Sequence, residues 1–193
     1  MNIFYLNADP VESAKRMCDQ HIVKMPLESA QILSTAHRVL DGRLVEGTSA
    51  SGRKAKRWIL PKWDDKYYLA AYVNHPSTVW ARQSDEHYDW LYKHFRALSA
   101  EFYERFSHNH TSWLKLRMFL SRMPKNIKSN GWVDPPQCMP DTYKDEDTIV
   151  AYNLYYMSKY TDWLAAGRPM KWNGNLRRAS YVSGSQCIKE ASC

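Results

Sequence analysis

The chain has 193 residues, of which 44% are hydrophobic, 24% charged and 13% aromatic. This balance is typical of one compact globular domain and excludes collagen-like, coiled-coil and wholly disordered chains. Lys and Arg number 27 against 20 Asp and Glu, and the net charge of +7 makes a polyanion the first partner to consider. No apolar run reaches the roughly 20 residues that a membrane helix needs, so we expect a cytoplasmic protein without membrane contact.

The cysteines are scattered, with no C-x-x-C pair and no histidine at ligand spacing beside them: Cys18, Cys138, Cys187 and Cys193. This spacing predicts neither a zinc site nor a disulfide framework. The common motifs of nucleotide-binding, zinc-peptidase and serine-hydrolase sites do not occur in the sequence either. We therefore expect no metal and no cofactor.

Hydrophobic spacing and helix boundary signals predict a mainly α protein. An apolar, extended lead-in covers residues 2–6, and Asp9 starts a helix over residues 10–24. Pro26 predicts a kink or a fresh helix start, because proline fits the first turn of a helix but damages its interior. A second helix then covers residues 26–40.

The rest of the chain is predicted from the same signals. Residues 42–66 are rich in Gly, Ser, Lys and Arg, which indicates a surface loop, and no hairpin is evident. Further helices are expected over residues 65–73, 77–106, 112–122 and 145–166, with a proline-rich loop before the last one. We expect one domain over residues 1–174 and a polar tail over residues 175–193.

Glu28 is the strongest candidate for a chemical role. If a helix starts at Pro26, Glu28 lies in its first turn, where free N–H groups and the helix dipole favour a negative charge. An ionised carboxylate can hold a water for attack or stabilise a cationic sugar, the two tasks that breaking an N-glycosidic bond demands. The commoner meaning of this spacing is a plain acid at a helix start.

His21 lies seven residues before Glu28, roughly two helical turns, so both side chains face one cleft if the helix kink is modest. A single histidine on a partly apolar helix is more often a hydrogen-bonded structural residue. Gln20, Lys24 and Gln31 are ordinary helix surface when taken singly. Together with His21 they make a polar face beside an apolar one.

The segment Asp19-Gln20-His21, with Glu28 seven positions after the histidine, resembles the N-terminal helix of the phage pyrimidine dimer DNA glycosylases of the endonuclease V type. Pro76 with a long aromatic helix after it, and the stretch Arg168-Pro169-Met170-Lys171-Trp172, resemble the middle and C-terminal parts of that family. A larger group of phage-borne relatives is similar in a further set of positions: Asn74-His75-Pro76-Ser77, Trp80, Arg82, Pro136-Gln137 and Pro140-Asp141. The resemblance implies a single compact helical domain of the endonuclease V glycosylase type.

The resemblance also implies an enzyme that flips out and excises a damaged or hypermodified pyrimidine from double-stranded DNA and leaves an abasic site. It assigns the catalytic roles to Glu28, Met1, Asn2 and His21. DNA binding is expected from a second set of residues: Gln20, Lys24, Gln31, Arg82, Arg168, Lys171 and Trp172. For Trp172 a place in the core is an equal alternative. We expect a monomer, encoded by a phage or by a host that defends against one.

In the family the N-terminal amine attacks the sugar C1′, forms a Schiff base and so also nicks the strand. Here Met1 and Asn2 stand where the family exposes a small residue, and Leu27 and Gln31 replace two arginines beside the catalytic glutamate. A water held by Glu28 is therefore an alternative nucleophile, and an intact strand is then the product. Two other functions stay open: a non-catalytic DNA-binding protein on the same scaffold, and a phage DNA pyrimidine-modifying enzyme.

Overall fold

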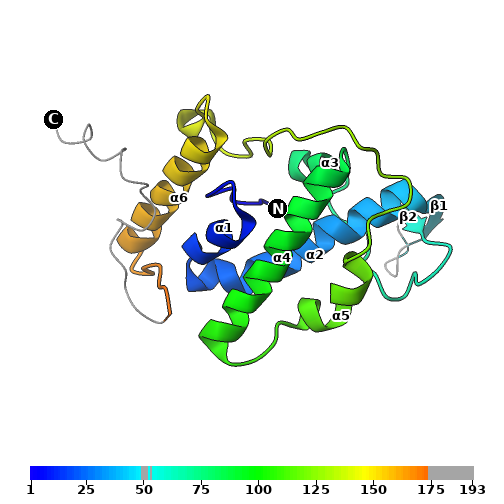
Figure 1. Ribbon diagram of the computed structural model, residues 1–193, viewed down its shortest axis with the longest axis horizontal. Helices are drawn as coiled ribbons and strands as arrows, with labels where there is room; N and C mark the ends of the chain where they lie inside the picture. The colour runs from blue at the N-terminus through cyan, green and yellow to red at the C-terminus, as the bar shows by residue number, and fades with distance from the viewer. Residues whose placement is uncertain (49–51, 53, 174–193) are drawn as a thin grey trace.

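The computed structural model describes residues 1–48, 52 and 54–173. Its helices are α1 (Pro10–Arg16), α2 (Asp19–Asp41), α3 (Pro76–Ala81), α4 (Asp85–Phe106), α5 (Thr111–Leu120) and α6 (Thr148–Ala165), with a short 3₁₀ helix, η1 (Asp141–Tyr143). Two strands, β1 (Arg43–Thr48) and β2 (Lys54–Ile59), form an antiparallel pair. The expected mainly helical fold is confirmed (Figure 1). The tail expected over residues 175–193 lies outside the described residues.

The two longest helices, α2 and α4, pack against each other at the centre of the molecule (Figure 1). α1 packs on α4, and α5 packs on α2. The N-terminal segment, residues 1–6, runs between this layer and α6. Its Phe4 ring stacks on Tyr155 of α6, and its Tyr5 ring meets Trp90 of α4 edge-on. Because residues 3–6 are all buried, the N-terminal segment is part of the hydrophobic core and its position is fixed.

The fresh helix start that is one alternative at Pro26 is wrong, because α2 continues through this proline. The chain breaks earlier, at Met17 and Cys18, between α1 and α2. A proline inside a helix costs about 3 kcal/mol, since it removes one backbone hydrogen bond and crowds the preceding turn. Each large apolar side chain that α2 buries stabilises it by about 1.5–3 kcal/mol. Such side chains lie on both sides of the proline, among them Ile22, Met25, Ile32 and Leu33.

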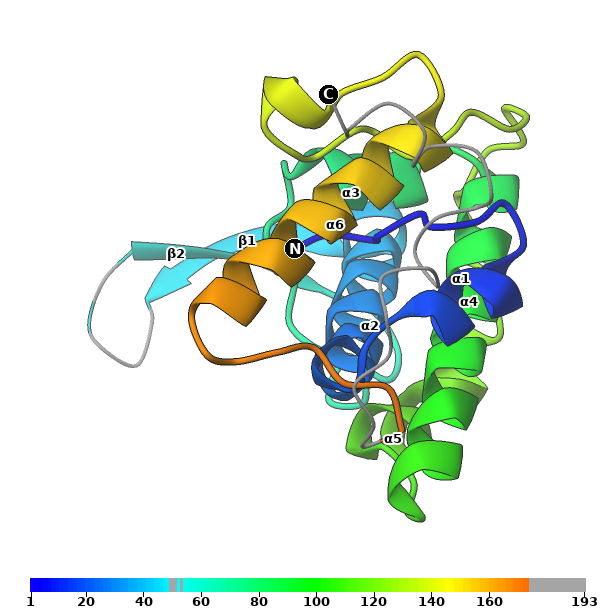
Figure 2. The same ribbon diagram turned by 90° about the vertical axis from the view of Figure 1, so that its left-hand side faces the viewer.

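Residues 42–66 are not the surface loop that their composition suggests, because β1 and β2 pair there as a hairpin. Figure 2 shows the two strands projecting from the helical body. Most of their described side chains are exposed. Neither strand has a buried face, so neither needs the alternation of apolar and polar residues that marks a half-buried strand in a sequence. Side-chain pairs across the two strands contribute to the pairing instead, such as Glu46 with Lys56, whose charged groups lie 3.5 Å apart.

The helix expected over residues 65–73 is absent as well. Arg38, buried in α2, donates hydrogen bonds to the backbone carbonyl groups of Asp64, Tyr67 and Tyr68 at 2.7, 3.1 and 2.6 Å. These carbonyl groups turn toward one guanidinium group rather than along a helix axis. The shape of this segment is therefore set by a tertiary contact with α2, which no local sequence pattern reveals.

The long helix expected over residues 77–106 is interrupted at residues 82–84, between α3 and α4. Ser84 is buried there, and the Asp85 N–H at the start of α4 donates to the Lys128 carbonyl at 3.0 Å. The helices expected near the C-terminal end are confirmed as α5 and α6, with ends that differ by at most three residues. Among the helices that the structure describes, none is both long and apolar enough to cross a membrane. The described residues also contain no group of three or more His, Cys, Asp or Glu side chains that could hold a metal ion.

Candidate active site

Glu28 lies in the middle of α2, and only 11% of its side chain is exposed. Its Oε1 forms an ion pair with Lys24 Nζ at 2.9 Å, and its Oε2 accepts a hydrogen bond from the Asn2 backbone N–H at 3.1 Å. The first-turn position expected for Glu28 is wrong, because α2 begins nine residues earlier, at Asp19. An ammonium group and a backbone N–H, rather than a helix N-terminus, face the two carboxylate oxygens.

The N-terminal segment reaches Glu28 because its backbone bends sharply. Phe4 has a φ of 53°, which is rare for a bulky residue and costs free energy that the surrounding packing must offset. Asn2 braces the bend, since its Oδ1 accepts a hydrogen bond from the Phe4 N–H and its Nδ2 donates to the Cys138 carbonyl, each at 3.0 Å. Met1 packs half-buried against the core. The structure thus brings Met1 and Asn2 to the candidate acid.

His21 makes its contacts with α6 and the N-terminal segment rather than with Glu28. Its Nδ1 lies 2.6 Å from the Tyr156 hydroxyl and 3.3 Å from Cys18 Sγ, and its ring packs on Phe4. Burial is the main cause that lowers the pKa of His21 to about 3. The ring is therefore neutral near pH 7, and it joins α2, α6 and the N-terminal segment.

Several residues expected to bind DNA lie on one surface, where α2 meets the loop after α6. Gln20 Nε2 donates to the Pro169 carbonyl at 3.3 Å, and Gln20 Oε1 accepts from the Lys171 N–H at 3.5 Å. The side chains of Arg168 and Lys171 are exposed on that loop. Lys24, one turn further along α2, has a side chain that is 65% exposed. These side chains form a basic and polar surface, and Lys24 connects it to Glu28 through their ion pair.

Three residues expected at the DNA interface have other surroundings. The half-buried Arg82 uses its guanidinium group to hold two backbone carbonyl groups, at 2.7 and 3.0 Å. Trp172 is buried, and its Nε1 donates to the Arg16 carbonyl at 3.0 Å. Its ring faces the core, so the structure favours the core alternative for Trp172 over base stacking. Gln31 is half-buried on α2.

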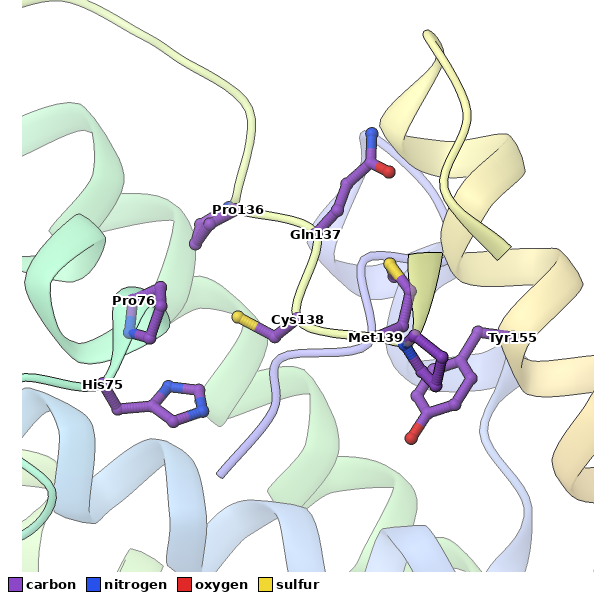
Figure 3. A pocket seen from close by; sticks show the side chains of 8 residues that line it. His75, Pro76, Pro136, Gln137, Cys138, Met139 and Tyr155 are labelled. Carbon is purple, nitrogen blue, oxygen red and sulfur yellow. The ribbon is translucent and has the colours of Figure 1, made fainter. Parts of the chain in front are cut away.

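An open pocket of about 500 Å³ adjoins the N-terminal segment. His75 and Pro76 at the start of α3, residues 136–140, and Tyr155 of α6 form its wall (Figure 3). The wall includes Cys138, the residue whose carbonyl group accepts the Asn2 hydrogen bond. In the sequence, His75, Pro76 and residues 136–140 are singled out only by a resemblance to other proteins, and Tyr155 is not singled out at all. Their convergence on one pocket depends on the tertiary fold, so local spacing does not predict it.

The part of the chain that carries Glu28, the N-terminal segment and His75 matches a known family. The model of the family described as pyrimidine dimer DNA glycosylase matches residues 1–115, well over half of the 193 residues. The chain belongs to the pyrimidine dimer DNA glycosylase family. No curated protein and no solved structure matches it.

Membership in the pyrimidine dimer DNA glycosylase family indicates DNA as the substrate and DNA glycosylase activity in general. The family match covers only part of the candidate site. Glu28, the N-terminal segment and His75 lie within the segment matched to the glycosylase family, whereas residues 136–140 and Tyr155 lie beyond residue 115. One side of the pocket is therefore built by a part of the chain that the family match does not cover.

Proposed function

We propose that the chain is a DNA N-glycosylase that everts a damaged or hypermodified pyrimidine from double-stranded DNA, excises the base and leaves an abasic site. The observation that carries this proposal is the nearly buried Glu28 carboxylate beside a fixed N-terminal segment, within the residues matched to the glycosylase family. The net charge of +7 supports attraction to DNA phosphates.

Glu28 acts on the sugar in this proposal. The bond between C1′ and the base nitrogen breaks, and its electron pair leaves with the base, which takes up a proton. The sugar then carries positive charge, and a carboxylate shielded from water lowers the energy of that cation. The oxygen of a water molecule bonds to C1′, and Glu28 accepts the proton that this water releases.

The Met1 amine is the alternative nucleophile. α-Amines are less basic than lysine side chains and are more often unprotonated near neutral pH. Attack by the amine would form a Schiff base at C1′ and lead to strand cleavage. We favour water, because the Met1 side chain packs against the core, which restricts how the N-terminal amine can approach a sugar.

Borohydride trapping separates the two nucleophiles. With water as the nucleophile, borohydride captures no covalent adduct between protein and DNA, and the strand stays intact until alkali cleaves it at the abasic site. A trapped adduct that disappears after acetylation of the N-terminus would show that the amine is the nucleophile.

Replacement of Glu28 by Gln tests the catalytic assignment. Glutamine keeps the size of the side chain and an oxygen for the Asn2 N–H, but it removes the negative charge. We expect base release to slow by ~10²-fold or more while affinity for DNA persists. Mass spectrometry of bases released from ultraviolet-damaged, glucosylated and otherwise modified DNA measures the rate.

Glu12→Gln is a matched control, because Glu12 is an exposed glutamate on α1 that pairs with Lys15 at 2.8 Å. It should release base at the parent rate. Unchanged release by Glu28→Gln would refute the role of Glu28. A parent protein that binds DNA and releases nothing would be a non-catalytic binding protein, and one that alters bases in place would be a pyrimidine-modifying enzyme.

A further inference from the structure

The pocket beside Asn2 has the size and lining of a site for a flat heterocyclic ring. Its volume of about 500 Å³ lies within the range of ~300–1,000 Å³ that is typical of small-molecule sites. Three prolines, Met139 and the Tyr155 ring form much of the wall, and the polar side chains among them are His75, Gln137 and Cys138 (Figure 3). Such a wall allows a base to stack on apolar groups while a few hydrogen bonds orient it.

Asn2 connects this pocket to Glu28. Its backbone N–H bonds the Glu28 carboxylate at 3.1 Å, and its side-chain Nδ2 bonds the Cys138 carbonyl at 3.0 Å. A single residue therefore spans the distance from the acid to the pocket wall. In a nucleotide a single bond joins C1′ to the base, so a base that enters the pocket with its sugar on the Asn2 side would have C1′ near Glu28.

Most polar groups of the wall are already bonded within the protein. The Gln137 amide forms two hydrogen bonds with the Asp145 backbone, at 2.6 and 3.1 Å. Cys138 Sγ lies 3.4 Å from the Ser77 hydroxyl. Among the described wall residues, His75 Nε2 and the Tyr155 hydroxyl keep hydrogen-bonding capacity that the protein does not use.

His75 is held so that Nε2 is a donor. Its Nδ1 accepts a hydrogen bond from the Ser77 N–H at 3.2 Å, which caps the start of α3. Burial chiefly, and then the positive Met1 amine, lower the pKa of His75, while the Glu28 carboxylate opposes them. A neutral imidazole whose Nδ1 accepts a hydrogen bond carries its proton on Nε2. The influence of both charges also means that His75 lies within electrostatic reach of Met1 and Glu28.

We propose that the pocket receives the everted pyrimidine and that His75 Nε2 donates a hydrogen bond to a carbonyl oxygen of this base, a role that rests on the proposed glycosylase function. When the bond to C1′ breaks, its electron pair goes to the base, and negative charge spreads onto the carbonyl oxygens. A fixed donor at one of these oxygens stabilises the departing base, while Glu28 stabilises the sugar. Residues 136–140 and Tyr155 then determine which substituted pyrimidines enter.

His75→Ser removes the donor and keeps the helix cap, because serine is a favoured residue at this position. His110 supplies a matched control. Its Nδ1 caps α5 in the same way, accepting from the Ser112 N–H at 3.1 Å, and His110 does not line the pocket. We expect His75→Ser to release base about 10²-fold more slowly than the parent, and His110→Ser to release it at the parent rate.

Duplex DNA with a tetrahydrofuran abasic analogue separates base recognition from folding. This duplex has no base for the pocket, so His75→Ser should bind it with the parent affinity. Weaker binding of this duplex, or base release at the parent rate, would overturn the proposal.

Cys138 gives a second measurement that needs no catalysis, because its half-buried side chain lines the pocket whereas Cys18 is buried. The Glu28→Gln protein, with Cys187→Ser and Cys193→Ser, is alkylated with iodoacetamide. We expect duplex DNA with a modified pyrimidine to slow the alkylation of Cys138 several-fold, and the abasic-analogue duplex to leave it unchanged. Equal protection by both duplexes would refute the pocket assignment. Protection by base-containing DNA alone, together with a parent that releases no base, would support the pocket and refute the glycosylase function.

Discussion

Three buried histidines are held neutral by their surroundings. Burial is the main cause that lowers the pKa of His21 to about 3, and it lowers the pKa values of His37 and His94 to about 4. In an unfolded chain a histidine titrates near ~6.5. The folded protein therefore binds fewer protons than the unfolded chain over the interval between these values.

We expect the free energy of unfolding to decrease as the pH falls from about 6.5 toward 4, because the histidines bind protons in the unfolded chain but stay neutral in the folded protein. Each histidine contributes up to about 1.4 kcal/mol per pH unit in this interval. Urea unfolding at a series of pH values measures the slope. His21→Gln should reduce the slope of unfolding free energy against pH by the contribution of one histidine. An unchanged slope would show that His21 accepts a proton in the folded state.

The buried Arg38 side chain makes five hydrogen bonds from α2 to other described residues. Besides the three carbonyl groups of residues 64–68, it binds the Trp58 carbonyl and the Asp64 carboxylate, each at 2.6 Å. Arg38→Met should destabilise the protein by roughly 3 kcal/mol or more, because four carbonyl groups in half-buried surroundings lose their donor. Urea denaturation measures this loss. Arg117→Met, at an exposed position on α5, should change stability little, and a loss below about 1 kcal/mol in Arg38→Met would contradict the assignment.

Sequence patterns predict those helices whose signals are local. α5 and α6 have such signals, and their position is confirmed. Pro26 is misleading because its local cost is outweighed by packing on both sides of it. The β1–β2 hairpin is not predicted, because its exposed strands lack an apolar face. The irregular segment after the hairpin is not predicted either, because its backbone carbonyl groups bond to Arg38.

In the candidate site, too, the sequence predicts some features and not others. Glu28 and the N-terminal residues can be singled out from sequence, because they lie in a block with specific spacing. The surroundings of His21 and Trp172 cannot, since each is defined by partners far along the chain, Tyr156 and Arg16. The pocket wall is also non-local, with one side at α3 and the other beyond α5. The family resemblance therefore singles out Glu28 as the candidate acid, whereas neither resemblance nor spacing predicts the pocket beside it.

The hairpin presents exposed cations away from the helical body, including Lys54 and Arg57 on β2 (Figure 2). We expect both to contact DNA phosphates. The double variant Lys54→Ala/Arg57→Ala should then reduce the slope of log affinity against log salt concentration by about 1.8, or about 0.9 for each phosphate that the protein no longer neutralises. Fluorescence anisotropy at several salt concentrations measures the slope. Lys93→Ala, which removes a lysine paired with Asp89 on α4, is the control, and an equal slope in the double variant would exclude the hairpin from the interface.

The candidate site is built from segments near both ends of the described chain. Glu28 and the N-terminal segment come from the matched residues 1–115, while residues 136–140 and α6 contact the N-terminal segment. Tyr156 of α6 joins the two ends, since its buried hydroxyl accepts a hydrogen bond from the Cys18 N–H and also bonds His21. We therefore expect the candidate site to form only when α6 docks on the N-terminal segment.

The burial of the N-terminal segment under α6 also has a consequence during protein synthesis. The Leu6 carbonyl accepts a hydrogen bond from Asn153 at 3.2 Å, across a separation of 147 residues. At about 5–20 residues per second, a ribosome needs roughly 7–30 s to cover that separation. For this interval the apolar residues 3–6 have no α6 to cover them, which makes them an early target for a chaperone. A nascent chain that still lacks α6 should therefore be inactive toward DNA, so activity begins only near the end of translation.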